Sequence, residues 1–298
     1  MKPGDSRSRP WEPWLRAPPS EFGLDVTVAI AAITEPDEVI VCVTDRMISF
    51  HDQTAASDDV ADKAFQIHKR NWLVGFAAQD VSVVWPIIKA IRPQLADKGD
   101  WNLPEVKDIV SAAYIKQFHK EFLTKHLVRL GFESVQEFKD FGLQKLGREI
   151  FGPIAHELNM FHLGAEFLVY GFDSYRRAHI FDVRNPGHVT DHSVLKYAAV
   201  GSGYDMAVAS LRRKRLDRRL APTIYRLLEA KFSSETASGV GKTTGLLLLH
   251  KRRDITFVEP ADIAKIRKVW ETEVAAPDPK EATEFIANLD GVRNASKG

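Results

Sequence analysis

The chain has 298 residues, of which 44% are hydrophobic, and its 41 Lys and Arg nearly balance 40 Asp and Glu. This length suits one large domain or two ordinary ones. The even charge gives no support to a global basic field that would hold nucleic acid, so no nucleic-acid partner is expected. One Cys excludes a disulfide framework and a thiolate metal cluster, as is typical of a reducing compartment. Composition therefore predicts a soluble, cytoplasmic, globular protein.

No segment has the length and apolarity of a membrane span. The longest unbroken apolar runs, such as residues 28–33, fall far below the roughly 20 residues that a spanning helix needs. Residues 1–24 are Pro-rich and basic and lack the apolar core of a secretory signal. We expect this leader to be disordered and the protein to make no membrane contact.

Apolar, β-branched residues on either side of a Glu-Pro-Asp turn predict a hairpin at the start of the body, with strands at residues 26–33 and 39–44. A third strand, two helices with helical apolar spacing and a helical, turn-rich segment follow. These are expected at residues 72–78, 81–95, 106–130 and 131–160.

The second half alternates in the same way between strands and pairs of helices. Strands are expected at residues 165–171, 178–183, 188–190, 197–200, 244–250 and 255–258. Helices are expected at residues 205–216, 221–232 and 261–272. This order favours helices that cover mainly antiparallel sheets over the β-α-β rhythm of a parallel sheet. The body has no Ser- or Gly-rich linker, which favours one domain.

Chemically active side chains fall at strand ends and turns. They are Thr27 at the head of a strand, Asp45 at a strand end, Lys63 in an Asp-Lys turn, and the turn Gly201-Ser202-Gly203 before a helix. A hydroxyl nucleophile needs a base and a nearby cation, and an Asp-Lys pair supplies an oriented ammonium. A Gly-Ser-Gly turn can offer a hydroxyl relay and N–H donors for an oxyanion. Singly, each is also an ordinary strand, surface-turn or helix-cap feature.

Six motifs occur in one order across residues 26–258. They are TVAIAA at 27–32, VTDR at 43–46, DKAFQI at 62–67, LVGFAA at 73–78, EFLVYGFD with HIFDV at 166–183, and YAAVGSGYDMAVASL at 197–211. In this order they resemble the proteasome family of N-terminal-nucleophile (Ntn) hydrolases, including the bacterial ATP-dependent peptidase relatives. The resemblance implies an α+β fold, a four-layer αββα sandwich of two mainly antiparallel sheets. The domain would span residues 25–260 with a helical insertion near 131–160, and residues 261–298 would form a C-terminal helix and polar tail.

The resemblance also implies a threonine protease mechanism. Thr27 would be the nucleophile and its free α-amine the base, with Asp45 and Lys63 orienting and polarising it and Ser202 near the amine. The glycines of the same turn, Gly201 and Gly203, would shape it or form an oxyanion site. No cofactor and no metal are implied. The expected partners are copies of the chain in a ring or smaller multimer, a peptide or protein substrate, and an ATP-dependent unfoldase.

Two departures from the family pattern leave alternatives open. First, 26 residues precede Thr27, and Val26 stands where the family's cleaved subunits usually have Gly. Translation that begins at Val26, followed by methionine removal, would expose Thr27 and make the leader absent from the mature protein. An alignment that puts Asp25 at the nucleophile position would instead make the chain a non-catalytic subunit with a structural or gating role. Second, residues 233–242 offer no clear counterpart of the family's later Asp and Ser.

Other motifs favour plainer interpretations. The segment 241–244, Gly-Lys-Thr-Thr, is half of a phosphate-binding loop, but Thr236 stands where the first Gly belongs and a strand follows where a helix is required. A nucleotide-binding regulator is therefore only a third hypothesis. The basic run at 212–219 lacks interleaved aromatics and indicates a solvated or subunit-facing surface. The His residues are expected to be structural, and Cys42 to be a buried strand residue.

Overall fold

The computed structural model describes residues 27–36, 38–46, 48–49, 56–57, 63–68, 71–96, 99–213, 218–237, 239–252 and 255–273. It is a mixed α and β structure with two five-stranded antiparallel sheets and a small two-stranded sheet, which confirms the α+β prediction. Within these residues no helix is both long and apolar enough to cross a membrane. The expectations for the leader and for the polar tail beyond residue 273 lie outside the described residues.

The first sheet has the strand order β10-β1-β2-β11-β12. Its strands are β1 (Ala29–Ile33), β2 (Val39–Asp45), β10 (Tyr197–Val200), β11 (Thr244–His250) and β12 (Ile255–Phe257). The expected hairpin is β1 with β2, paired antiparallel from Ala29 opposite Thr44. Every residue of both strands is buried, as their continuous apolar runs predict.

The second sheet has the order β5-β6-β7-β8-β9. Its strands are β5 (Ala64–His68), β6 (Trp72–Ala78), β7 (Ala165–Phe172), β8 (Ala178–Arg184) and β9 (His188–Asp191). The sequence did not predict β5 as a strand, nor the short pair β3 (Ile48–Ser49) and β4 (Ala56–Ser57). Only two of the five β5 residues are buried, because β5 lies at the edge of its sheet.

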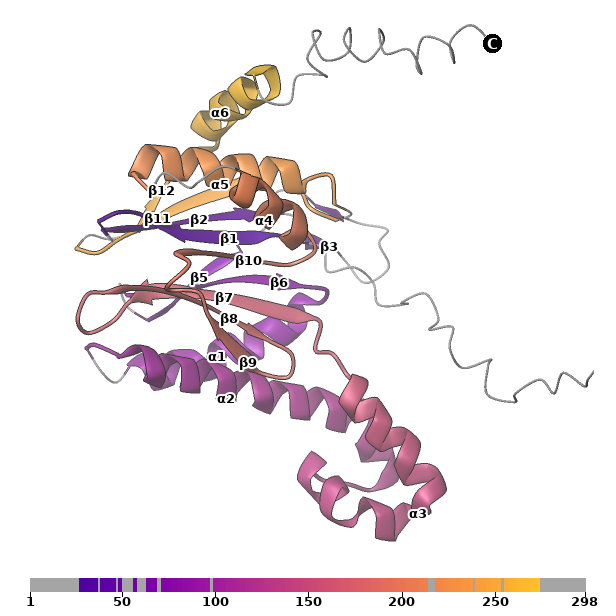
Figure 1. Ribbon diagram of the computed structural model, residues 1–298. Helices are drawn as coiled ribbons and strands as arrows, with labels where there is room; N and C mark the ends of the chain where they lie inside the picture. The colour runs from indigo at the N-terminus through magenta and orange to yellow at the C-terminus, as the bar shows by residue number, and fades with distance from the viewer. Residues whose placement is uncertain are drawn as a thin grey trace, which may run out of the picture.

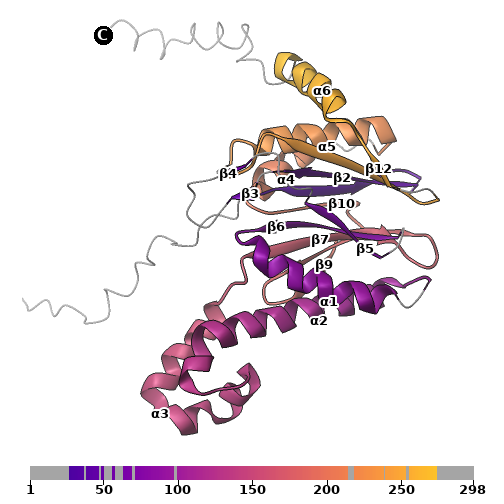
Figure 2. The ribbon, with the colours of Figure 1, turned by 180° about the vertical axis from the view of Figure 1, so that it is seen from behind.

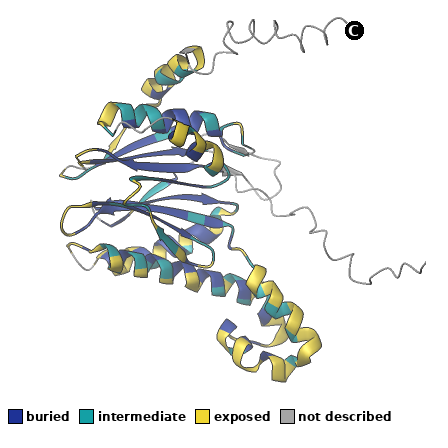
Figure 3. Cartoon of the chain, in the orientation of Figure 1, coloured by how far each residue is buried: buried dark blue, intermediate teal, exposed yellow. Residues whose placement is uncertain are grey.

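The two sheets face each other, and helices lie on their outer faces (Figure 1; the reverse view is Figure 2). The helices α4 (Tyr204–Arg213) and α5 (Leu220–Ser234) pack on the first sheet, with α6 (Pro260–Glu273) beyond them. The helices α1 (Val84–Ala96) and α2 (Leu103–Phe122) pack on the second sheet. A third apolar cluster fills the space between the sheets. Figure 3 shows the central strands of both sheets buried, whereas the edge strands β9 and β12 are partly exposed.

The segment expected as an insertion forms an arm that projects from the body (Figure 1). After α2 come a π-helical turn (Leu123–Leu127) and a 3-10 turn (Val128–Leu130), and then α3 (Val135–Met160), which is kinked at Gly147 with φ 73°. The α-helix expected through residue 130 thus ends earlier. A fourth cluster of Phe122, Leu127, Phe132, Val135 and Phe138 gives the arm a core of its own.

Candidate active site

Thr27 and Asp45 lie at the same end of the first sheet, where β1 begins and β2 ends. Antiparallel pairing of a hairpin brings the first residues of one strand beside the last residues of the other. Val28 N–H donates to Asp45 Oδ1 at 3.2 Å, and Asp45 N–H donates to Val28 O at 3.1 Å. These two contacts hold the Asp45 carboxylate next to Thr27.

Lys63 reaches the same place from the second sheet. It directly precedes β5, and its Nζ donates to Asp45 Oδ1 at 3.0 Å, to Asp45 Oδ2 at 3.2 Å and to Thr27 Oγ1. All three residues are at most 2% exposed. Charges buried this deeply need a paired and hydrogen-bonded partner, and here each charge has one.

The environment of the Asp45 carboxyl is set by burial and by four donated hydrogen bonds. Burial raises the pKa of Asp45 above its ordinary value, while the Lys63 ammonium and the N–H groups of Gly241 and Val28 oppose that rise. Gly241 N–H donates to Oδ2 at 3.2 Å. The ammonium that Asp45 orients lies on the Thr27 hydroxyl oxygen, where positive charge stabilises alkoxide character.

The main chain of Thr27 rests against the predicted Gly-Ser-Gly turn. Thr27 N–H donates to Ser202 Oγ at 3.3 Å, Ser202 Oγ donates to Thr27 O at 3.3 Å, and Gly203 N–H donates to Thr27 O at 3.4 Å. Gly201 has φ +97°, and a Cβ there would collide with Thr27 O. A residue with a side chain would therefore push the turn away from Thr27.

The N–H groups of Gly201 and Gly203 both have acceptors within the chain. Gly201 N–H donates to Glu166 Oε2 at 2.9 Å, and Gly203 N–H donates to Thr27 O. Both N–H groups therefore take part in hydrogen bonds that hold the turn in place. An oxyanion role for either N–H stays a prediction, because the N–H would have to exchange its present acceptor for a substrate oxygen.

A close approach of the two sheets lets Lys63 cross between them. A Cβ built on Gly75 of β6 would lie 3.3 Å from Ala29 Cβ of β1 and 3.8 Å from Lys63 O. Small residues at this crossing bring the start of β5 within reach of Asp45. The sequence around Lys63 indicated a charged side chain, but it did not indicate that a small residue is needed at Gly75 of β6.

The structure thus brings together all four predicted side chains, Thr27, Asp45, Lys63 and Ser202. Asp62, the neighbour of Lys63 in the predicted turn, lies outside the described residues. Sequence reasoning missed two contributors, the Gly241 N–H and the Glu166 carboxylate. Each contact involves a backbone N–H, of Gly241 in one case and of Gly201 in the other. Residue types alone do not predict which backbone N–H contacts which carboxylate.

The remaining motifs have structural roles in the described chain. The Gly-Lys-Thr-Thr segment leads into strand β11, and no helix follows it as a phosphate-binding loop requires. His179 lies between Asp173 Oδ2 at 3.0 Å and Ser193 Oγ at 3.2 Å. Burial raises the pKa of the Cys42 thiol to about 12, so at neutral pH it stays protonated.

Among the described residues no group of three His, Cys, Asp or Glu is arranged to hold a metal ion. The basic run belongs partly to the end of α4, where Arg212 and Arg213 are exposed, and partly to residues 214–217, outside the described residues. Arg218 pairs with Glu35 at 2.7 Å. These contacts are compatible with the solvated surface expected from the sequence.

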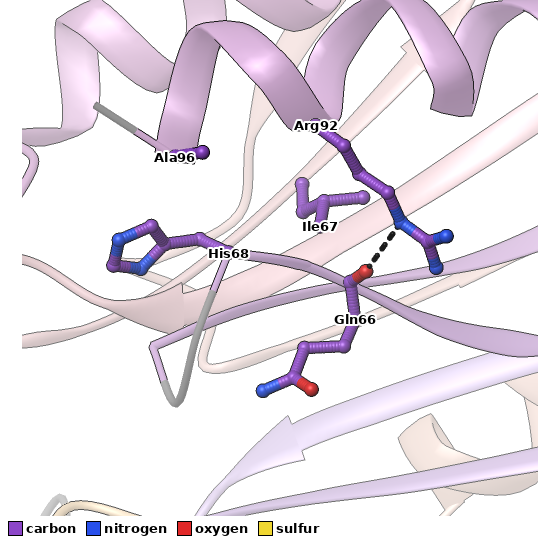
Figure 4. A pocket seen from close by; sticks show the side chains of 5 residues that line it. All are labelled: Gln66, Ile67, His68, Arg92 and Ala96. Atoms are coloured by element: carbon purple, nitrogen blue, oxygen red, sulfur yellow. Dashed lines mark hydrogen bonds between the residues drawn. The ribbon is translucent and has the colours of Figure 1, made fainter. Parts of the chain in front are cut away.

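Two pockets include residues of the second sheet. One is lined by Gln66, His68 and Arg92, with Arg92 Nε donating to Gln66 O at 3.0 Å, and Figure 4 shows it between β5 and α1. It lies toward the far end of β5 from Lys63. A second pocket includes Glu166 and Arg184 and adjoins the Gly-Ser-Gly turn, since Glu166 accepts the Gly201 N–H.

No protein-family model matches the chain, and no curated protein matches it. The geometry around Thr27 is therefore the principal evidence on function.

Proposed function

We propose that this chain is a proteasome-like threonine hydrolase that cleaves amide bonds, with peptides or proteins as substrates. The proposal includes its fold type, a four-layer αββα sandwich of the Ntn-hydrolase kind. The fold type is supported by helices on the outer faces of two facing antiparallel sheets.

One observation carries the proposal: the Lys63 ammonium contacts both Asp45 and the Thr27 hydroxyl, while Ser202 contacts the Thr27 nitrogen. The hydroxyl is thus beside a cation, and the main-chain nitrogen that would be its base is held by a second hydroxyl. A surface Asp-Lys turn would not place these three groups in one buried cluster.

The reaction follows from these positions. The free α-amine of Thr27 takes the proton of Oγ1, directly or through a water, as Oγ1 attacks the substrate carbonyl carbon. Lys63 lowers the free energy of the developing alkoxide, and Asp45 keeps the ammonium oriented. The amine then protonates the leaving nitrogen, and water hydrolyses the ester on Thr27 to regenerate the hydroxyl. This chemistry requires that Thr27 be the first residue of the mature protein.

An electrophilic probe for N-terminal threonine, such as a β-lactone, tests the proposal on protein expressed from its native gene. We expect one adduct per chain by intact mass, and an N-terminus that begins at Thr27. Thr27→Ala should reduce labelling to background, whereas Thr27→Ser should keep it because the hydroxyl remains.

Thr34→Ala is the matched control. Thr34 is also a buried Thr beside β1, but it hydrogen-bonds only locally, to Val39 O at 2.9 Å. It should label like the wild type per folded molecule. A mature chain that keeps residues before Thr27 and takes no label would instead support a non-catalytic proteasome-like subunit.

The proposal also includes partners: the chain would assemble into a homo-oligomer and act together with an ATP-dependent unfoldase.

A further inference from the structure

Gly241 lies between two buried groups of opposite charge. Its N–H donates to Asp45 Oδ2 at 3.2 Å, and its C=O accepts from Lys231 Nζ at 2.6 Å. Asp45 and Lys231 are both 0% exposed. The turn residue that contacts the Asp45 carboxylate is therefore held from its other side by an ammonium.

Lys231 uses all three of its N–H donors. They go to Gly241 O, to Lys242 O at 3.0 Å and to Glu235 Oε1. A buried ammonium that loses an acceptor is destabilised by the free energy of an unmade charged hydrogen bond, so the two carbonyls cannot easily rotate away. Burial lowers the pKa of Lys231 below its ordinary value, and the carboxylates of Glu235 and Asp45 oppose that fall.

Helix α6 joins the same network through Arg267. Its guanidinium donates to both oxygens of Glu235, at 2.7 and 2.6 Å, and to Lys242 O at 2.7 Å. It also stacks 4.1 Å from the centre of the Phe232 ring. A bidentate, stacked guanidinium is a geometrically specific contact, unlike an ordinary surface ion pair.

We infer that Lys231 and Arg267 are positioning residues for Asp45. Together they hold the 241–242 turn, so that the Gly241 N–H stays on Asp45 Oδ2 and the carboxylate keeps its orientation toward Lys63. Helix α6, which lies on the outer side of the described structure, is thereby linked to the site (Figure 1). The effect on turnover rests on the proposed function, whereas the effect on the turn does not.

The test compares Arg267→Gln with Lys265→Gln. Lys265 is the matched control, because it is a cation of the same helix that pairs with Asp262 at 2.7 Å at the surface, with its side chain 77% exposed. In Arg267→Gln we expect exchange of the Gly241 amide hydrogen to quicken by about tenfold, as for a local opening made easier. In Lys265→Gln it should keep the wild-type rate. Equal exchange in both variants and the wild type would overturn the inference.

Turnover gives a second readout, normalised to sites titrated with the threonine probe so that unfolded protein does not count. We expect Arg267→Gln to lower kcat by about tenfold with KM unchanged, and Arg267→Lys to recover part of the loss. Wild-type kcat per titrated site in Arg267→Gln would contradict the positioning role. If the wild type shows no turnover while the exchange difference is present, the proposed function fails and the link from α6 to Asp45 stands.

Discussion

The Lys63 ammonium contacts both the Asp45 carboxylate and the Thr27 hydroxyl, and a neutral side chain could not balance the charge of the carboxylate. It neutralises the buried Asp45 carboxylate and donates to the Thr27 hydroxyl. Removing one member of such a pair leaves the other charge buried without its partner, which typically costs more than replacing both. Stability and chemistry at this site can therefore be separated by mutation.

Asp45→Asn should lower the free energy of unfolding by about 3–5 kcal/mol, because the Lys63 ammonium then loses its counter-charge in the interior. The double variant Asp45→Asn/Lys63→Met should recover most of that loss. Both should fail to label at Thr27. Denaturant unfolding and probe labelling measure the two properties, and a single variant as stable as the wild type would contradict the buried-pair argument.

The sequence predicted the side chains of the candidate site, but it did not predict the backbone group that contacts them. Thr27, Asp45, Lys63 and Ser202 stand at ends of elements in a recognisable order, and the structure brings them together. Gly241 contacts Asp45 only through its backbone N–H, which nearly every residue type carries. The identity of residue 241 therefore could not predict this contact.

Among the elements, the crossing of β1 and β6 decides how close the sheets lie at the site. Gly75 and Ala29 face each other there, and the gap between them leaves no room for a branched side chain. Packing this tight is sensitive to added volume, because neighbours must shift or adopt strained rotamers.

Gly75→Val should therefore destabilise the protein by about 1–3 kcal/mol and reduce labelling of Thr27, since Lys63 is displaced with β5. Gly152→Val is the control, because a Cβ at Gly152 meets nothing within 4 Å. Its stability should stay within about 0.5 kcal/mol of the wild type, as a helical Gly is replaced by a residue of similar or better propensity. Thermal unfolding and the labelling rate measure both effects. Equal effects of the two substitutions would argue against a volume limit at the crossing.

The buried strands with long apolar runs were predicted from the sequence, and so were the more exposed edge strands β9 and β12, whereas β5 was not. The hairpin β1-β2 and the strands β7, β8 and β11 follow their apolar runs. The edge strand β5 has one exposed and two half-buried residues and was missed, although it follows Lys63 directly. Helix α2 was expected through residue 130 because its apolar stripe continues into a π-helical turn, which side-chain spacing does not distinguish from an α-helix.

In the whole molecule the arm has an apolar cluster of its own, which meets the core of the body at Leu158 and Phe161. Phe138 is 1% exposed and packs with Phe132 and Phe151 at centroid distances of 5.4 and 5.0 Å, within the arm cluster. Phe167 is 0% exposed and packs in the body, beneath α1 and α2. The sequence predicted a helical segment here, but helical spacing says nothing about which cluster a side chain joins.

Phe138→Ala should destabilise the arm by about 3–5 kcal/mol, the usual cost of removing a buried Phe side chain. The site around Thr27 should stay intact. Hydrogen exchange should quicken within residues 132–160 only, and labelling of Thr27 per molecule should equal that of the wild type. Phe167→Ala, the same change in the body, should instead lower the global free energy of unfolding by a similar amount. Loss of labelling in folded Phe138→Ala would show that the arm supports the site.

The route of Lys63 from one sheet to the other has a consequence for the order of events in folding. Thr27 and Asp45 can meet as soon as the β1-β2 hairpin forms, a local step, but their ammonium arrives only when the second sheet docks across Gly75. On the proposed function, a chain in which the two sheets have not docked would thus hold an unactivated hydroxyl. Reactivity of Thr27 toward an electrophile would then report whether the second sheet has docked, and on the same proposal a chain without that contact would be inactive toward amide bonds.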